Sequence, residues 1–259
     1  MAFKDGDFVL INYVVSVKDG DKEVVQDTNI ADVAKKSGIY DSNKRYEPYL
    51  VVVGRSQVLK AIDAQLRDMD VGQRKEFTAA PEDAYGPYRE DLIIRVPIKQ
   101  LNRYGITPVV GRRVEVGGRI GVIRSVTERF AYIDFNHPLA GKDLKIELEV
   151  VGKLESLEDK VKYLVVRYIP LDKSLIQISQ EPDGTLDISL PQDTMGFSDL
   201  ESRLQLLAND LSSLLDVKSA KVIISLVTPR KEGQAQAAQA GAQPAQAAEE
   251  QAQQSSQQP

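Results

Sequence analysis

The sequence predicts an α+β protein with more than one domain. Its 259 residues exceed the usual size of a single domain, and 42% of them are hydrophobic, which is enough for a substantial core. Short β-branched runs bounded by turn residues recur through the first two thirds of the chain. Three other segments carry apolar residues at helical spacing. We therefore expect sheets and helices in separately packed units.

The first unit is expected to begin with a hairpin. The run DFVLINYVVSV, residues 7–17, is rich in β-branched and aromatic residues, and the turn Asp19-Gly20 leads to a second strand at 23–27. Residues 29–47 are polar and aperiodic, which predicts a loop or bulge with room for one helical turn. Pro48 introduces another apolar run, YLVVVG.

A helix and a loop with functional character follow. Leu59, Ile62, Leu66 and Met69 recur at spacings of three and four, which predicts an amphipathic helix that ends near Gly72 and lies across the sheet. Residues 74–79 are typical of a strand. The segment PEDAYGPY, 81–88, is dense in turn residues and carries two tyrosines, and such loops more often serve function than packing.

The next segment predicts an inserted β module. Four short strand candidates lie between residues 91 and 135, namely DLIIRV, RRVEV, RIGVIRSV and FAYIDF, with Gly117-Gly118 as a hairpin signal. The run LKIELEVV, residues 144–151, then returns to complete the first sheet. An insertion into the first unit is the simplest account of this order.

A second α+β unit and a polar tail complete the chain. Ser156 with Asp159, and Ser198 with Glu201, have the spacing of helix N-terminal caps, and the strands IQIS, TLDISL and AKVIISLV lie between and after the two helices. We interpret the leucine stripe of the second helix as a core face rather than a dimer seam. Residues 231–259 contain nine alanines, ten glutamines and no large apolar residue, which predicts disorder.

Composition excludes several function classes. The net charge of -5 gives no reason to expect nucleic acid or a membrane as partner. The chain has no cysteine and one histidine, His137, so we expect no metal site and no cofactor, and we interpret His137 as structural. The N-terminus does not have the pattern of a signal peptide, and no apolar stretch approaches the ~20 residues that span a bilayer, so we expect a cytoplasmic location.

One segment resembles a known family. Residues 53–86, VGRSQVLKAIDAQLRDMDVGQRKEFTAAPEDAYG, resemble the central strand, helix and loop of FKBP-type prolyl isomerases, while VLINYVVSVKDG and LKIELEVVGKL resemble the first and last strands. The interruption, with RVPIKQL and NHPLAG, resembles the SlyD-like subgroup that carries a chaperone module in the flap. The bulge and the additional C-terminal domain resemble the long archaeal members.

The resemblance implies a fold and a set of domain boundaries. The fold is an antiparallel FKBP sheet wrapped on one helix, with an inserted small β domain and a C-terminal α+β domain. We expect the isomerase domain at 1–87 and 136–154, the insert at 88–135, the C-terminal domain at 155–230 and the tail at 231–259.

The resemblance also implies a function. It indicates a peptidyl-prolyl cis/trans isomerase that accelerates proline-limited folding and binds unfolded or partly folded, proline-containing polypeptides through its insert. The implied catalytic residues are Tyr13, Asp27 and Tyr85, and the implied substrate-binding residues are Tyr49, Val58, Leu59, Ile62 and Ile146. Ile62 stands where the short members have tryptophan, and Gln26 where an aromatic residue is common, so we expect a shallower pocket.

Two other readings remain. The first is a non-catalytic protein in which the FKBP-like domain is a docking surface and the C-terminal domain forms a homodimer. The second, a metal-dependent hydrolase, has no evident ligand set. The histidine-rich tail of many SlyD proteins is absent here, which argues against metal handling.

Overall fold

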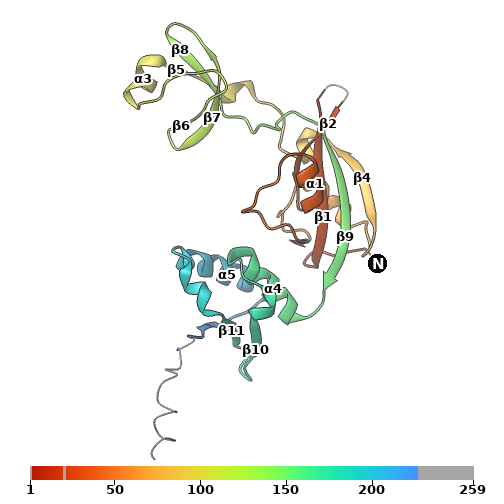
Figure 1. Ribbon diagram of the computed structural model, residues 1–259. Helices are drawn as coiled ribbons and strands as arrows, with labels where there is room; N and C mark the ends of the chain where they lie inside the picture. The colour runs from red at the N-terminus through yellow and green to blue at the C-terminus, as the bar shows by residue number, and fades with distance from the viewer. Residues whose placement is uncertain (1, 20–21, 227–259) are drawn as a thin grey trace, which may run out of the picture.

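The chain folds into three packed units. The computed structural model describes residues 2–19 and 22–226 (Figure 1). Long strands form the central unit, a small β unit lies beyond one end of them, and an α+β unit lies at the other end. The expected turn at Gly20 and the expected disordered tail at 231–259 fall outside the described residues. Within the described ranges, no helix is long and apolar enough to cross a membrane.

The central unit is an antiparallel sheet wrapped on a short helix. Its strand order is β2-β1-β9-β4, and β3 also pairs with β1. One edge of β1 pairs with β9, and the other pairs first with β3 and then with β2. The strands are β1 (Phe8–Asp19), β2 (Lys22–Thr28), β3 (Tyr49–Val52), β4 (Arg74–Ala79) and β9 (Leu144–Leu154).

Two helices accompany this sheet. Helix α2, Lys60–Leu66, packs Ile62 and Leu66 into the core formed by one face of the sheet. The helix ends at Leu66, earlier than the end near Gly72 that its apolar spacing predicts. Met69, beyond the end of the helix, is nevertheless buried, with 2% exposure. Helix α1, Ala31–Lys36, is the single helical segment between β2 and β3, so the expected bulge with one helical turn is confirmed.

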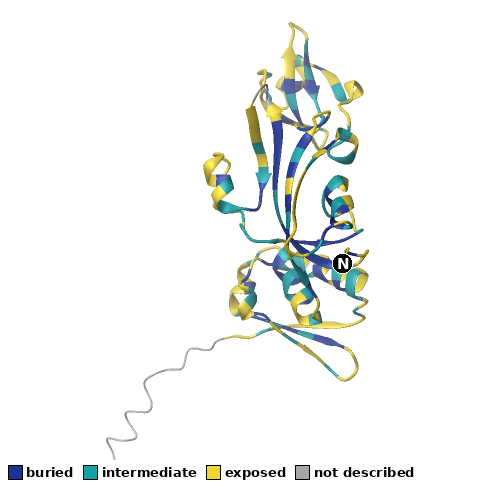
Figure 2. Ribbon diagram, turned by 90° about the vertical axis from the view of Figure 1, so that its right-hand side faces the viewer, coloured by how far each residue is buried: buried dark blue, intermediate teal, exposed yellow. Residues whose placement is uncertain are grey.

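Strands β1 and β3 are buried on both faces. Alternate residues of each strand enter two different cores: one is shared with α2, and the other is shared with the C-terminal unit. The residues on the C-terminal side are Phe8, Leu10, Leu50, Val52 and Leu154. Figure 2 shows buried segments gathered where the long strands meet the helices of the C-terminal unit. The C-terminal unit therefore covers one face of the central sheet.

The insert has its own sheet and core. Its strands are β5 (Ile93–Pro97), β6 (Arg113–Val116), β7 (Arg119–Val126) and β8 (Phe130–Asp134), in the order β5-β8-β7-β6. All four expected strands are present. Helix α3, Ile98–Arg103, was not expected, because one buried residue, Leu101, gives no periodic signal. Gly117 and Gly118 both have positive φ, as a tight hairpin between β6 and β7 requires.

The C-terminal unit combines two helices with a three-stranded sheet. The elements are α4 (Leu157–Tyr168), β10 (Gln177–Gln180), β11 (Leu186–Leu190), α5 (Leu200–Leu215) and β12 (Ala220–Ile224), with β11 and β12 parallel. The Ser156 hydroxyl accepts from the backbone N–H of Asp159 at 3.0 Å, as the sequence predicts. The prediction for α5 is wrong, because its N-terminal cap is Asp199 and carries no side-chain hydrogen bond.

The leucine stripe of α5 packs into its own domain. Leu207 and Leu211 are buried, and the other members of the stripe pack against the same core. The interpretation of this stripe as a core face is confirmed. Dimerisation through this domain stays a prediction.

Short 3₁₀ turns complete the described elements: Pro81–Asp83, Glu90–Leu92, Lys173–Leu175 and Gln192–Gly196.

The shared core predicts that the central sheet is not stable alone. A fragment that ends at Leu154 exposes large apolar side chains such as Phe8 and Val52, which are each 1% exposed in the full chain. We expect a loss of stability on the order of 5 kcal/mol and binding of a hydrophobic dye. Both are measured on this fragment and on a chain ending at Leu226: thermal unfolding gives the difference in stability, and dye fluorescence reports the exposed apolar surface. Equal unfolding midpoints without dye binding would contradict the shared core.

Candidate active site

A cavity of about 320 Å³ lies between β1, β3 and the start of α2. The structure brings seven of the eight predicted site residues together in its lining; the complete lining is Tyr13, Val15, Asp27, Tyr49, Gln57, Val58, Leu59, Ile62 and Tyr85. The sequence analysis missed Val15 and Gln57. Strand alternation from Tyr13 could have indicated Val15, whereas Gln57 had no local signal.

Ile146 is the predicted residue that the cavity lacks. It lies on β9 with 0% exposure, opposite Val15 on β1 and Phe77 on β4, and belongs to the same core as Ile62. The prediction that it contacts substrate is therefore corrected, because a fully buried side chain offers no surface to a ligand. Ile146 supports the cavity from behind.

A hydrogen-bonded corner fixes the polar side of the cavity. The Tyr13 hydroxyl donates to Asp27 Oδ2 at 2.9 Å, and Lys44 Nζ donates to Asp27 Oδ1 at 2.5 Å. Burial, followed by the charge of Asp27, raises the pKa of Tyr13, so its hydroxyl stays protonated. Both carboxylate oxygens of Asp27 thus have partners. Lys44, from the bulge between β2 and β3, was not identified from the sequence.

Asn29 holds the backbone of Tyr13 where β1 changes partner from β3 to β2. Asn29 is 5% exposed. Its Oδ1 accepts from the N–H of Tyr13 at 2.8 Å, and its Nδ2 donates to the carbonyls of Ile11 at 2.8 Å and Glu47 at 3.0 Å. Its amide replaces the ladder partner that β1 lacks at this point. This bridge fixes both Tyr13 and the end of the bulge.

The loop from residue 54 to residue 59 forms the second wall. Gly54 and Ser56 have φ of 78° and 53°, and a Cβ on Gly54 would lie 2.6 Å from Cγ of Asp5, so the turn needs glycine there. Gln57 Oε1 accepts from the N–H of Val52 at 3.0 Å and from Arg167 Nη2 at 3.2 Å. The loop thereby presents the backbone N–H of Leu59, which donates no hydrogen bond within the described part of the chain.

Tyr85 stacks on the single histidine. It follows the 3₁₀ turn Pro81–Asp83, and its ring lies parallel to that of His137, with centroids 3.9 Å apart and planes 9° apart. His137 comes from the segment that returns from the insert, and its Nδ1 accepts from the N–H of Leu139 at 3.1 Å. The Tyr85 hydroxyl has no hydrogen-bond partner among the described residues. Burial raises the pKa of Tyr85, so this hydroxyl remains a donor at neutral pH.

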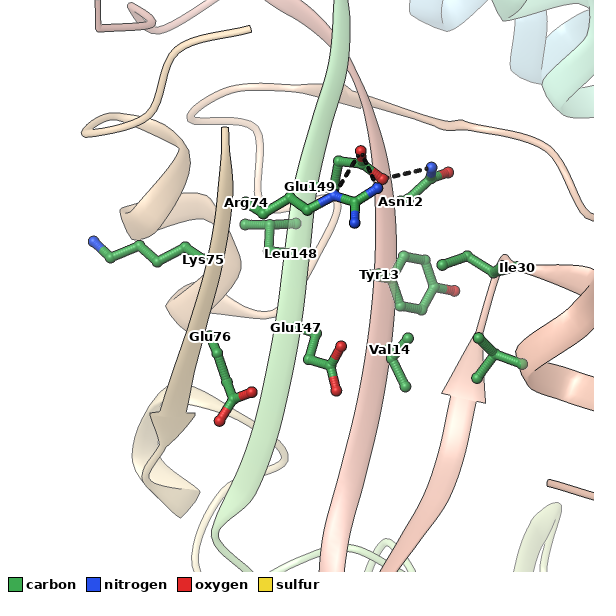
Figure 3. Close-up of a pocket in the computed structure, with 11 residues that line it drawn as sticks. Asn12, Tyr13, Val14, Ile30, Arg74, Lys75, Glu76, Glu147, Leu148 and Glu149 are labelled. Atoms are coloured by element: carbon green, nitrogen blue, oxygen red, sulfur yellow. Dashed lines mark hydrogen bonds and ion pairs between the residues drawn. The ribbon is translucent and has the colours of Figure 1, made fainter. Parts of the chain in front are cut away.

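A larger cavity, about 510 Å³, lies on the face of the sheet opposite α2 (Figure 3). Three of its polar side chains are bonded to one another: Glu149 accepts from Asn12 Nδ2 at 3.1 Å and from Arg74 Nε at 2.9 Å. It shares Tyr13 with the smaller cavity, but charged side chains from β4 and β9 line much of it. The smaller, more apolar cavity suits a proline ring better.

Antiparallel strands wrapped on one short helix, with an apolar cavity where that helix starts, define the FKBP class of proteins. Comparison with known proteins agrees with this class. The family model described as FKBP-type peptidyl-prolyl cis-trans isomerase matches residues 1–99, and the model described as FKBP26, IF domain, matches residues 95–139.

Individual relatives agree with the family models. A short-type peptidyl-prolyl cis-trans isomerase of Methanocaldococcus jannaschii is 35% identical over 147 residues, which is 57% of this chain and 91% of the relative. The FKBP-type isomerase SlyD of Helicobacter pylori is 28% identical over 48% of this chain and 69% of its own length, and SlyD of Escherichia coli K12 is 30% identical over 42% and 58%. The chain belongs to the FKBP-type peptidyl-prolyl cis-trans isomerases.

The stacked histidine predicts a specific dependence of stability on pH. Burial lowers the pKa of His137 from its ordinary value of 6.5, so the folded state binds this proton less readily than the unfolded state. The stabilising contribution is present above pH 6.5 and declines as the pH falls below it. We expect the thermal midpoint of His137→Phe, which keeps an aromatic ring, to fall less than that of the wild type between pH 8 and pH 5. Equal pH dependence in both proteins would refute this role.

Proposed function

We propose that the cavity between β1, β3 and α2 is where this isomerase rotates prolyl bonds, and that the insert presents unfolded chains to it. The barrier to rotation, ~18–20 kcal/mol, arises from lost amide resonance, so no nucleophile is required. A twisted amide has less charge separation than a planar one. A dry apolar cavity therefore favours the transition state over the ground state.

The available hydrogen-bond donors support this proposal most directly. Tyr49, Val58 and Ile62 supply apolar walls, while the Tyr85 hydroxyl and the Leu59 N–H stand at the cavity without partners in the described residues. They would hold the carbonyls on either side of the proline. The Tyr13–Asp27 corner would keep the polar side rigid while the bond rotates.

Variants at the polar positions test the site. We expect Tyr85→Phe to lower kcat/KM on a short proline peptide by about 3- to 10-fold, the value of one hydrogen bond, and Asp27→Ala to lower it further because Tyr13 and Lys44 lose their partner. The assay is proline isomerisation coupled to a protease. No acceleration by the wild type would favour the alternative, a non-catalytic docking protein.

A second tyrosine–aspartate pair provides a matched control. The Tyr88 hydroxyl donates to Asp134 Oδ2 at 2.5 Å in the segments that join the insert to the isomerase sheet. Neither residue lines the 320 Å³ cavity. Tyr88→Phe and Asp134→Ala are therefore expected to keep wild-type kcat/KM on the same peptide.

Exposed apolar side chains in the insert support the proposed binding of unfolded chains. Tyr104, Val109, Val110 and Ile120 are 72%, 54%, 61% and 62% exposed. Unfolded segments offer apolar side chains that such surfaces bind weakly, and tethering them beside the cavity raises the local concentration of proline. The insert would therefore matter more for protein substrates than for short peptides.

Substitutions in the insert separate these two substrate classes. We expect Val110→Ser and Ile120→Ser together to lower catalysis of proline-limited protein refolding by roughly 3- to 10-fold, since two apolar contacts are lost. Turnover of a tetrapeptide should not change. Val71→Ser is the matched control, because Val71 is 53% exposed but lies in the isomerase unit. Unchanged refolding catalysis in the double variant would reject the proposed role of the insert.

A further inference from the structure

A second cavity of about 330 Å³ adjoins the proposed proline site. It lies between residues 44–50, which are the end of the bulge and the start of β3, and helix α4 of the C-terminal unit. Both cavities are lined by Tyr13 and Tyr49, whose rings meet edge to face with centroids 6.4 Å apart and planes at 88°. This ring pair is therefore a wall that the two cavities share.

Contacts between the two units hold the second cavity open. Arg167 on α4, with a side chain 17% exposed, donates to the carbonyl of Leu50 at 3.0 Å and to Gln57 Oε1 at 3.2 Å. Its other terminal nitrogen donates to Asp210 at 3.1 Å. Arg167 thus ties α4 to β3 and to the loop that lines the proline site. Because the walls of the cavity are held in this way, they lose little conformational entropy when a ligand binds.

The chemistry of the walls indicates the kind of group that fits. Pro48, Tyr163 and Val166 provide apolar surface, and Val166 is 7% exposed. Cations at the rim already have partners: Lys44 pairs with Asp27 at 2.5 Å, and Arg45 and Lys173 both pair with Glu47, at 3.2 and 2.8 Å. Each of these cations has a carboxylate partner, although Arg45 and Lys173 share one, so none of them is left unpaired to bind a charged side chain. An uncharged apolar or aromatic side chain suits this cavity.

We propose that this cavity is a second subsite, which binds an apolar or aromatic side chain of the same polypeptide whose proline occupies the first cavity. An extended chain advances roughly 3.3 Å per residue, so a side chain two or three positions from the proline reaches past the ring pair. The subsite rests on the proposed role of the first cavity. It gives the C-terminal unit a part in choosing which prolines are isomerised.

Peptides of constant length test this subsite. Each carries one central proline in an alanine sequence with charged ends, and a single phenylalanine occupies the second or third position on either side. We expect the full-length wild type to prefer phenylalanine over alanine by roughly 5- to 10-fold in kcat/KM at one of these positions, mainly through KM. The ratio between two peptides does not depend on how much of the enzyme is active, so partial misfolding cannot imitate the result.

Two opposite changes to the cavity should remove the preference. Tyr163→Ala removes a wall, and Val166→Phe fills the space, so both are expected to bring the phenylalanine-to-alanine ratio close to one. Met195→Ala is the control, because Met195 is 60% exposed in the C-terminal unit and lines neither cavity, and it should keep the ratio.

The outcomes are distinguishable. A wild type without positional preference, or a ratio that survives both variants, overturns the subsite while leaving the proline site intact. A wild type that accelerates none of the peptides overturns the proposed function, and the subsite with it. Loss of the ratio in both variants and its retention in Met195→Ala supports the subsite.

Discussion

Two-sided burial of β1 and β3 is the constraint on which the arrangement of the whole chain depends. These strands lie between α2 on one face and α4 on the other, and their alternate residues belong to different cores. Strands covered on both faces cannot slip in register without exposing one full row of apolar side chains. Tyr13 and Tyr49, which line the candidate site, are carried by these two strands, so the position of the site follows from the same packing.

The site combines an apolar cavity with few, fixed polar groups. Asp27 is the one carboxylate that lines it, and Tyr13 and Lys44 occupy both of its oxygens. A charge held in this way perturbs the cavity less than a free carboxylate would, which suits a reaction whose transition state has less charge separation than its ground state. Because this reaction requires no nucleophile, a chain with no cysteine and one histidine can belong to a family of enzymes that catalyse it.

Sequence patterns predicted the local features well. Strand β4 begins and ends at the expected residues, and Ser156 caps α4 as its spacing indicates. Gln57 was missed because its position depends on a contact between distant segments: it is held by Arg167, 110 positions away, and no local pattern records that. Helix α3 was missed because one turn and a half of helix with a single buried residue has no periodicity to detect.

The apolar patterns of the strands differ in a way that reflects their burial. The runs FVLI in β1 and LVV in β3 are continuously apolar, whereas LKIELEV in β9 alternates. Continuous runs are typical of strands covered on both faces, and alternation is typical of strands with one solvated face. The contrast indicates that something beyond α2 must cover β1 and β3, which the structure identifies as α4. Domain boundaries drawn along the sequence do not express this shared core.

The two additional units meet the candidate site near its two donors that have no partner among the described residues. His137, on the segment that returns from the insert, stacks on Tyr85. Arg167, from the C-terminal unit, holds Gln57, two residues before Leu59. Each donor at the cavity is thus held in place by a residue from outside the core of the isomerase sheet. Under the proposed function, the position of each donor decides whether it meets a carbonyl as the prolyl bond turns, so both units would influence the reaction without contributing a reacting group.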